Sequence, residues 1–288
     1  MSTLHPRLRA AVAVLGAGIM ANAVSNALHT NGFQLHRYNR TLAAIDGPAV
    51  VCTTAAQAAA SAAAVWSFVH DDKASRAVWF GPSGALRSAR GALVIESSTL
   101  STDYAEYWMA EAIRHGARPV LAPVTGSRPA TVEGALLAFV SGADADVDAA
   151  RQLLGTVARE VVRVDSARAV AEVKLLNNAL NAIILTGLAE VLTAATTLGL
   201  DRDQLVDVWS RHTWAAPVTA LYGSAMISGD HRLINCAVSV AAKDLRYARA
   251  TFGTPLLTLV ADRFDRAAAA GWGDHELSAI IEFCTETS

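Results

Sequence analysis

Lys174 and Asn178 are the residues whose type and spacing first suggest chemistry. They stand four residues apart in the long apolar stretch 168–199, so on a helix their side chains share one face. A buried lysine is costly without a partner or a function, and burial can adjust a lysine to act as acid or base beside a carbonyl group. The alternative is that Lys174 extends to solvent or pairs with Glu172 or Glu190.

A glycine pattern near residue 16 is typical of dinucleotide binding. Gly16, Gly18 and Ala21 occupy the positions of G-x-G-x-x-G/A, after the apolar run 11–15 and at the start of a helical segment. The first glycine permits a tight turn, the second lets the backbone approach a pyrophosphate, and the alanine allows close helix packing. The phosphates would face the helix N-terminus. The cofactor-binding residues expected here are Gly16, Gly18, Ile19 and Met20.

The end of the next predicted strand bears on the choice of cofactor. Enzymes that use NAD usually place an Asp or Glu there for the ribose hydroxyls. Here Asn39, Arg40 and Thr41 follow the strand instead. Amide, guanidinium and hydroxyl groups suit a 2′-phosphate, so NADP(H) is the expected cofactor. The alternative is that Arg40 is only a solvated loop residue.

Polar residues also follow two later predicted strands. His70 comes after the strand 64–69 and either contacts the cofactor or is an ordinary loop residue. Ser98 and Thr99 come after the strand 93–96. They either bond the substrate or the nicotinamide, or help to cap the next helix.

The segment 122–142 combines Pro, Thr, Gly and Ser just past a short predicted strand. Successive N–H groups and hydroxyls in a glycine-rich turn can hold a carboxylate. The candidates are Thr125, Gly126 and Ser127, with Arg128 as a possible charge nearby. The alternative is a hairpin-like turn without a binding role.

The composition excludes several classes of protein to which the chain could belong. The chain has 288 residues, of which 52% are hydrophobic and 17% charged, as suits a compact enzyme. Its 24 Lys and Arg nearly balance 26 Asp and Glu, and no basic run suggests nucleic-acid binding. The three cysteines lack the spacing of a zinc site, so we expect no metal and a reducing compartment. Residues 1–18 do not resemble a signal peptide, and polar residues interrupt the long helix. We therefore expect a cytoplasmic protein without a membrane partner.

Two domains are expected to position these residues. Apolar runs alternate with helical stretches up to residue 165, which predicts a Rossmann-like, doubly wound α/β domain over 1–165. No strand pattern follows, so 166–288 should be all helical and begin with the long interdomain helix. That helix is apolar nearly all round, which predicts burial on several sides. Strands are predicted at 11–15, 34–38, 50–52, 64–69, 93–96, 118–121, 137–141 and 160–164. Helices in the second domain are predicted at 168–199, 200–211, 217–227, 238–251 and 255–270.

Several motifs stand in one order along the chain. They are G-A-G-I-M-A at 16–21, E-S-S-T-L-S at 96–101, A-P-V-T-G-S at 122–127 and K-L-L-N-N at 174–178. The series resembles the β-hydroxyacid dehydrogenase family, which includes 3-hydroxyisobutyrate dehydrogenase and the glyoxylate/succinic semialdehyde reductases. The likeness extends from about residue 10 to 282, and A-A-K-D-L-R-Y-A at 241–248 looks like the family's lysine-aspartate motif.

This resemblance implies roles for single residues. It makes Lys174 the catalytic acid/base of an NADP(H)-dependent hydride transfer with a small 3-hydroxy acid or aldehyde acid, with Asn178 beside the substrate. It implies that the substrate-binding residues are Thr125, Gly126, Ser127 and Asp244, and that Thr99 and Lys243 contact the cofactor. It also implies a homodimer formed through the helical domain.

The chain departs from the family pattern at two positions near the expected pocket. Leu121 replaces a frequent acidic residue, and Cys236 replaces a common aromatic residue. Both changes predict a reshaped substrate pocket. Trp209, Trp214 and Tyr222 either line this pocket or belong to the helical core.

Two other functions stay open. An imine or iminium reductase of a specialised pathway would share this fold and cofactor loop, but such enzymes generally lack a lysine at position 174. A non-catalytic NADPH-binding protein would have no need of Lys174, Asn178 and Lys243 together.

Overall fold

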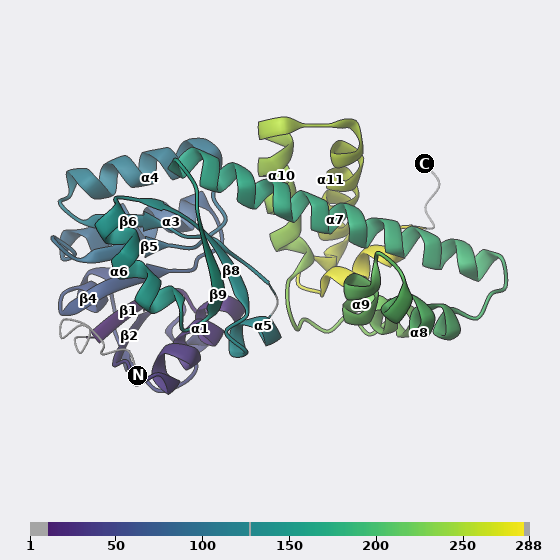
Figure 1. Cartoon of the computed structure of the whole chain (residues 1–288), viewed down its shortest axis with the longest axis horizontal. Coiled ribbons are helices and arrows are strands. Elements are labelled where there is room, and N and C mark those ends of the chain that lie inside the picture. The colour runs from purple at the N-terminus through teal and green to yellow at the C-terminus, as the bar shows by residue number, and fades with distance from the viewer. Residues whose placement is uncertain (1–10, 127, 285–288) are drawn as a thin grey trace. The chain divides into compact units, whose positions relative to one another are not determined.

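The computed structural model describes residues 11–126 and 128–284 (Figure 1). The chain forms two compact units, which divide at Lys174 inside helix α7 (Ala167–Thr197). The domain boundary predicted at residue 165 falls in the bend just before this helix.

The first unit is built on a mostly parallel sheet with the strand order β3-β2-β1-β4-β5-β6-β8-β7, and β9 pairs with β8. The six parallel strands are β1 (Ala11–Leu15), β2 (Leu35–Tyr38), β3 (Val50–Val51), β4 (Ala62–Ser67), β5 (Leu93–Glu96) and β6 (Arg118–Leu121). The remaining strands are β7 (Val124–Thr125), β8 (Leu136–Gly142) and β9 (Ala158–Arg163). The order 3-2-1-4-5-6 reverses between β1 and β4, which is where doubly wound sheets bind their ligands.

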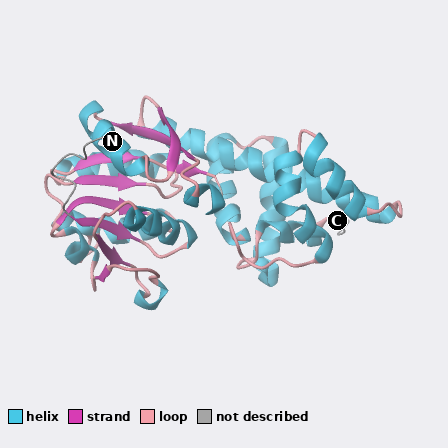
Figure 2. Ribbon diagram, turned by 60° about the horizontal axis from the view of Figure 1, so that its bottom comes forward, coloured by secondary structure: helices cyan, strands magenta, loops and turns pink. Residues whose placement is uncertain are grey.

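Helices cover both faces of this sheet (Figure 2). Alternate residues of β1 point to opposite faces, so Val12 and Val14 belong to one core and Ala13 and Leu15 to the other. Helices α1 (Ile19–Thr30) and α6 (Asp144–Leu154) contribute to the first core. The second core includes residues of α2 (Ala55–Ala59), α3 (Asp72–Phe80), α4 (Thr102–Arg114) and the start of α7. The prediction of a doubly wound α/β domain is confirmed.

The second unit is helical over its described residues, apart from an isolated bridge between Ala237 and Glu276. Its elements are the rest of α7, α8 (Arg202–His212), α9 (Ala216–Ser228), α10 (Val238–Phe252), α11 (Pro255–Ala267), a π-helical turn at Ala268–Trp272 and a 3-10 segment at Leu277–Phe283. Asp201 caps α8 through the N–H of Gln204 at 3.0 Å. The prediction of an all-helical region is confirmed.

Helix α7 is buried along one face and exposed along another, whereas its composition predicted burial on several sides. Leu176, Leu180, Ile184 and Val191 follow one stripe and are 36–57% exposed. The opposite face packs into the core of the second unit. By length and composition, this helix is the one in the described chain that could cross a membrane, and 44% of its apolar window is buried. Buried core helices pass the same test.

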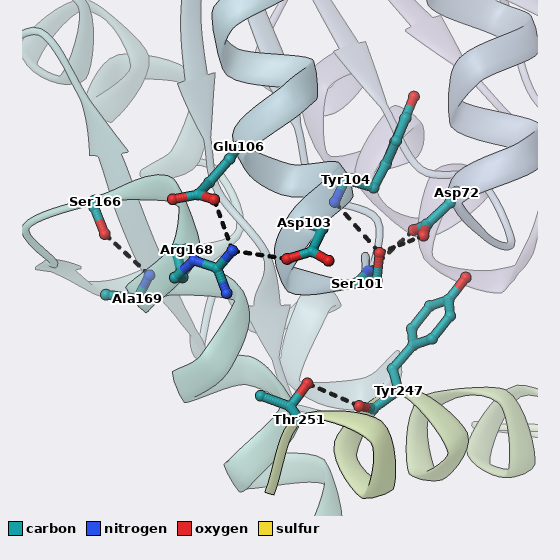
Figure 3. A network of polar contacts seen from close by, with 10 residues as sticks. All are labelled: Asp72, Ser101, Asp103, Tyr104, Glu106, Ser166, Arg168, Ala169, Tyr247 and Thr251. Carbon is teal, nitrogen blue, oxygen red and sulfur yellow. Dashed lines mark hydrogen bonds and ion pairs between the residues drawn. The ribbon is translucent and has the colours of Figure 1, made fainter.

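The first turn of α7 is tied to α4. The Arg168 guanidinium donates to Asp103 at 2.7 Å and to Glu106 at 2.8 Å (Figure 3). Both pairs are exposed, so we expect them to contribute little to stability.

Candidate active site

The loop between β1 and α1 has the form that the glycine pattern predicts. Gly16 has a φ of 113°, and a Cβ on it would lie 2.1 Å from the carbonyl oxygen of Phe68. Only glycine therefore fits there. A Cβ on Gly18 would meet no described atom within 4 Å. Gly18 is also the N-cap of α1, whose first turn contains no acidic residue, so this turn suits a diphosphate.

The turn after β2 carries no carboxylate at positions 39–41. The Asn39 side chain donates to the carbonyl of Thr41 at 2.8 Å. Arg40 and Thr41 are exposed beside it. The turn therefore offers polar groups and nothing that repels a phosphate.

Side chains tie the carboxyl ends of β4, β5 and β6 together. The indole N–H of Trp66 donates to Ser97 Oγ at 2.8 Å, and Ser97 Oγ donates to the carbonyl of Ala122 at 2.5 Å. Ser98 Oγ accepts the N–H of Val69 at 2.8 Å. Ser98 thus holds a neighbouring loop and does not cap the next helix.

Ser101 makes the cap of α4. Its hydroxyl accepts the N–H of Tyr104 at 3.4 Å and donates to Asp72 at 2.5 Å (Figure 3). Thr99 lies half-buried just before this cap, and His70 is exposed after β4. The cofactor contacts of Thr99 and His70 stay predictions.

Glu96 is a buried carboxyl group that we did not single out from the sequence. It is fully buried at the end of β5. It accepts from Ser75 Oγ at 2.6 Å, the indole of Trp79 at 2.7 Å and the N–H of Ser98 at 2.8 Å. Burial raises the pKa of Glu96, while these donors act in the opposite direction. The signal in the sequence is a charged residue that ends an apolar strand.

Thr125 and Gly126 lie where β7 ends. Thr125 pairs with Leu137 of β8 in an antiparallel ladder. Gly126 has a φ of 135°, and a Cβ on it would lie 2.5 Å from the Leu136 side chain, so glycine is required. Ser127 lies outside the described residues.

Helix α5 (Arg128–Val132) follows this loop and packs against α1. The Thr131 hydroxyl lies 3.8 Å from the sulfur of Met20, in the first turn of α1. The predicted substrate loop therefore lies beside the predicted dinucleotide loop. The side chain of Arg128 lies outside the described part of the chain.

In the second unit, three of the predicted residues form one polar cluster. Asn178 on α7 donates to Asp244 Oδ2 on α10 at 2.7 Å. Lys243 Nζ lies 2.6 Å from Asp244 Oδ1 and 5.2 Å from the centre of the Tyr247 ring. Lys243 and Asp244 are 4% and 5% exposed. The carboxylate is shared between an amide and an ammonium group, which fixes all three side chains.

Lys174 lies one helical turn before Asn178 and is only 9% exposed. It does not extend to solvent. Glu190 forms an ion pair with Arg263, and sixteen residues of helix put it roughly 24 Å along the axis from Lys174. Lys174 is therefore a buried amine on the same helix as Asn178.

Glu276 was also missed by sequence reasoning. Its buried carboxylate accepts the N–H groups of Ile234 at 2.8 Å, Asn235 at 2.6 Å and Cys236 at 3.2 Å. It therefore fixes the backbone that leads into α10. The signal in the sequence is an acidic residue that ends the glycine-containing turn G-W-G-D-H-E, just before an apolar run.

The three aromatic residues differ in burial. Trp209 and Tyr222 pack against the helical core, whereas Trp214 is fully exposed. The core interpretation therefore holds for Trp209 and Tyr222 and is wrong for Trp214.

Family models match nearly the whole chain. The model for the NAD binding domain of 6-phosphogluconate dehydrogenase matches residues 11–165. The model for the NAD-binding region of NADP-dependent 3-hydroxyisobutyrate dehydrogenase matches residues 169–284. The chain belongs to the β-hydroxyacid dehydrogenase family. It is an NAD(P)-dependent oxidoreductase, as the order of the motifs predicted.

Two relatives and one solved structure align over nearly their full lengths. An uncharacterized oxidoreductase of Synechocystis is 30% identical, over 94% of this chain and 96% of the relative. L-threonate dehydrogenase of Cupriavidus necator is 27% identical, over 94% and 95%. The structure of Psf3 in complex with NADP+ and 2-OPP superimposes with a TM-score of 0.87 at 25% identity, over 94% of this chain and 99% of that one.

Proposed function

We propose that this protein transfers hydride between NADP(H) and a small 3-hydroxy acid or aldehyde acid, with Lys174 as acid/base. The observation that carries the proposal is the buried Lys174 one turn before Asn178, whose amide is fixed by Asp244. A protein that only binds the cofactor has no need of a buried lysine one turn before such an amide.

The chemistry follows from the groups present. The nicotinamide supplies or accepts the hydride. Reduction of a carbonyl leaves an oxygen that needs a proton, and the Lys174 ammonium donates it; in the reverse direction the neutral amine accepts the proton of the hydroxyl. Positioned proton transfer of this kind contributes about 10² to 10⁴ in rate. Thr125 and Gly126 hold the acid group of the substrate through N–H and hydroxyl groups.

The preference for NADP(H) is supported by the turn after β2. Arg40 and Thr41 are exposed there, and no carboxylate stands at positions 39–41. The similar Psf3 structure contains NADP+. Lys243 is our proposed cofactor contact from the second unit.

A homodimer is the proposed assembly. The exposed stripe of Leu176, Leu180, Ile184 and Val191 on α7 supports it, because contiguous exposed apolar side chains usually mark an interaction surface.

The test is NADPH oxidation with glyoxylate, succinic semialdehyde, tartronate semialdehyde, methylmalonate semialdehyde and a cyclic imine, with NADH in parallel. We expect turnover with an aldehyde acid. Lys174→Met should keep NADPH binding, measured by nicotinamide fluorescence, and lose at least about 100-fold in kcat. Lys73→Met, at an exposed position of α3, is the matched control and should keep wild-type activity. Wild-type turnover in Lys174→Met would exclude the acid/base role, and turnover of the imine alone would favour the reductase alternative.

A further inference from the structure

Arg37 is a charged residue inside a buried strand. It follows Phe33 and Leu35 on the same face of the β2 segment, and all three are buried. The Arg37 side chain is 0% exposed in the first unit. Apolar residues are expected at such a position, so the arginine requires an explanation.

The guanidinium of Arg37 donates hydrogen bonds to the loop between β1 and α1 and to the first turn of α1. Arg37 Nη2 donates to the carbonyl of Gly16 at 2.9 Å and to Asn22 Oδ1 at 2.8 Å. Asn22 Nδ2 in turn donates to the carbonyl of Ala17 at 3.1 Å. Arg37 and Asn22 together therefore hold two successive carbonyl groups of the loop between β1 and α1.

Holding these carbonyls sets the direction of the N–H groups. In a planar trans peptide the N–H points opposite to the C=O. The bond from Arg37 to Gly16 O therefore turns the N–H of Ala17 away from Arg37. The bond from Asn22 to Ala17 O likewise turns the N–H of Gly18 away from the Asn22 side chain. Gly18 borders the open space where a Cβ would meet no described atom.

The charge of Arg37 is not neutralised by contact. Its third bond, from Nη1 at 3.1 Å, goes to the backbone carbonyl of Asp46 and not to the carboxylate. Among the described residues no carboxylate lies within ion-pair distance of Arg37. Burial lowers the pKa of Arg37 to about 10, and the charge of Asp46 partly offsets this effect. The guanidinium is therefore still protonated at neutral pH.

We propose that Arg37 is a positioning residue for the diphosphate of NAD(P)(H), which acts through Asn22 and the loop carbonyls and places a positive charge beneath the loop. The inference rests on dinucleotide binding by the first unit. It concerns the diphosphate that NADPH and NADH share, so it is independent of the choice between them.

The test is the affinity of Arg37→Met for NADPH and NADH, measured by calorimetry. Methionine fills a similar volume without charge. We expect both affinities to fall by the same factor, about tenfold or more, because a hydrogen bond to a charged group and the charge itself are lost. Arg37→Lys keeps the charge and should restore part of the affinity. Arg87→Met, at an exposed position, is the matched control and should bind both coenzymes normally.

Thermal unfolding without cofactor separates this role from a purely structural one. Arg37→Met removes a donor from the carbonyls of Gly16 and Asp46, so its Tm should fall. The titrations are therefore run well below the Tm of the variant, where the folded protein should still bind both coenzymes more weakly. Asn22→Ala keeps Arg37 and should also lower the affinity for both coenzymes. It provides the test if the Arg37 variant folds poorly. Wild-type affinity in folded Arg37→Met or in Asn22→Ala would overturn the proposal.

The same titrations distinguish this inference from the preference for NADP(H). Arg40→Met should lower the affinity for NADPH and leave the affinity for NADH unchanged. If Arg40→Met changes neither affinity while Arg37→Met lowers both, the NADP(H) preference fails and the role of Arg37 stands.

Discussion

Three buried charged or acidic residues hold loops in place. Arg37 binds the carbonyl of Gly16, Glu96 accepts the N–H of Ser98, and Glu276 accepts three N–H groups before α10. Each makes at least one hydrogen bond to a backbone group of a loop, and such groups need partners when a turn is buried. These residues shape the site without being its reacting groups.

Glu96 should make stability depend on pH. Its pKa is raised by burial, so the protonated form is favoured in the folded state. The stability that it contributes is complete below the ordinary pKa of a glutamate and is lost as the pH rises through the raised value. Within that window the slope approaches about 1.4 kcal/mol per pH unit.

Urea unfolding between pH 4 and 8 checks this prediction. Glu96→Gln cannot ionise, so its unfolding free energy should fall less steeply with pH than that of the wild type. Glu133→Gln, at an exposed position of the chain, should follow the wild-type curve. Equal slopes in the wild type and Glu96→Gln would show that the Glu96 carboxyl titrates normally.

At the scale of elements, one carboxylate links polar side chains of α7 and α10, which also share an apolar core. Asp244 accepts from Asn178 and lies 2.6 Å from Lys243 Nζ. Asp244→Asn would remove the carboxylate that lies against the buried ammonium group of Lys243. We expect a loss of about 3–5 kcal/mol in unfolding free energy.

Chemical denaturation monitored by helical circular dichroism measures this loss. Asp265→Asn breaks the more exposed pair with Arg246 and should cost at most about 1 kcal/mol. The double variant Lys243→Met/Asp244→Leu removes both charges and should be more stable than Asp244→Asn. A cost for Asp244→Asn no greater than that for Asp265→Asn would contradict the prediction.

The sequence patterns predict elements best where the pattern is long. Five buried apolar residues predict β1 with its observed bounds, whereas β7 has two residues and leaves no periodic signal. The contact of Asn178 with Asp244 joins residues 66 positions apart, which spacing alone does not reveal. Arg37 and Glu96 were missed because a charged residue is normally taken as exposed, and only the fold shows their burial.

At the scale of the whole molecule, we expect two copies of the chain to associate. Light scattering after gel filtration should give about twice the mass of 30.2 kDa. Leu180→Glu/Ile184→Glu places charges on the exposed stripe of α7 and should give the monomer mass, because a desolvated charge opposes association. Ile113→Glu, at an exposed position of α4, should leave the mass unchanged. A monomeric wild type would exclude the homodimer.

The hydrogen bonds from the backbone to Glu276 also affect how readily the protein can acquire new substrates by mutation. Because the carboxylate binds main-chain N–H groups at 234–236, any residue except proline can keep those bonds. The side chain at position 236 can therefore change in size or polarity while the start of α10 is retained. In directed evolution, saturation mutagenesis at Cys236 should alter substrate range at little cost in folding, and mutagenesis at Glu276 should yield mostly unstable proteins.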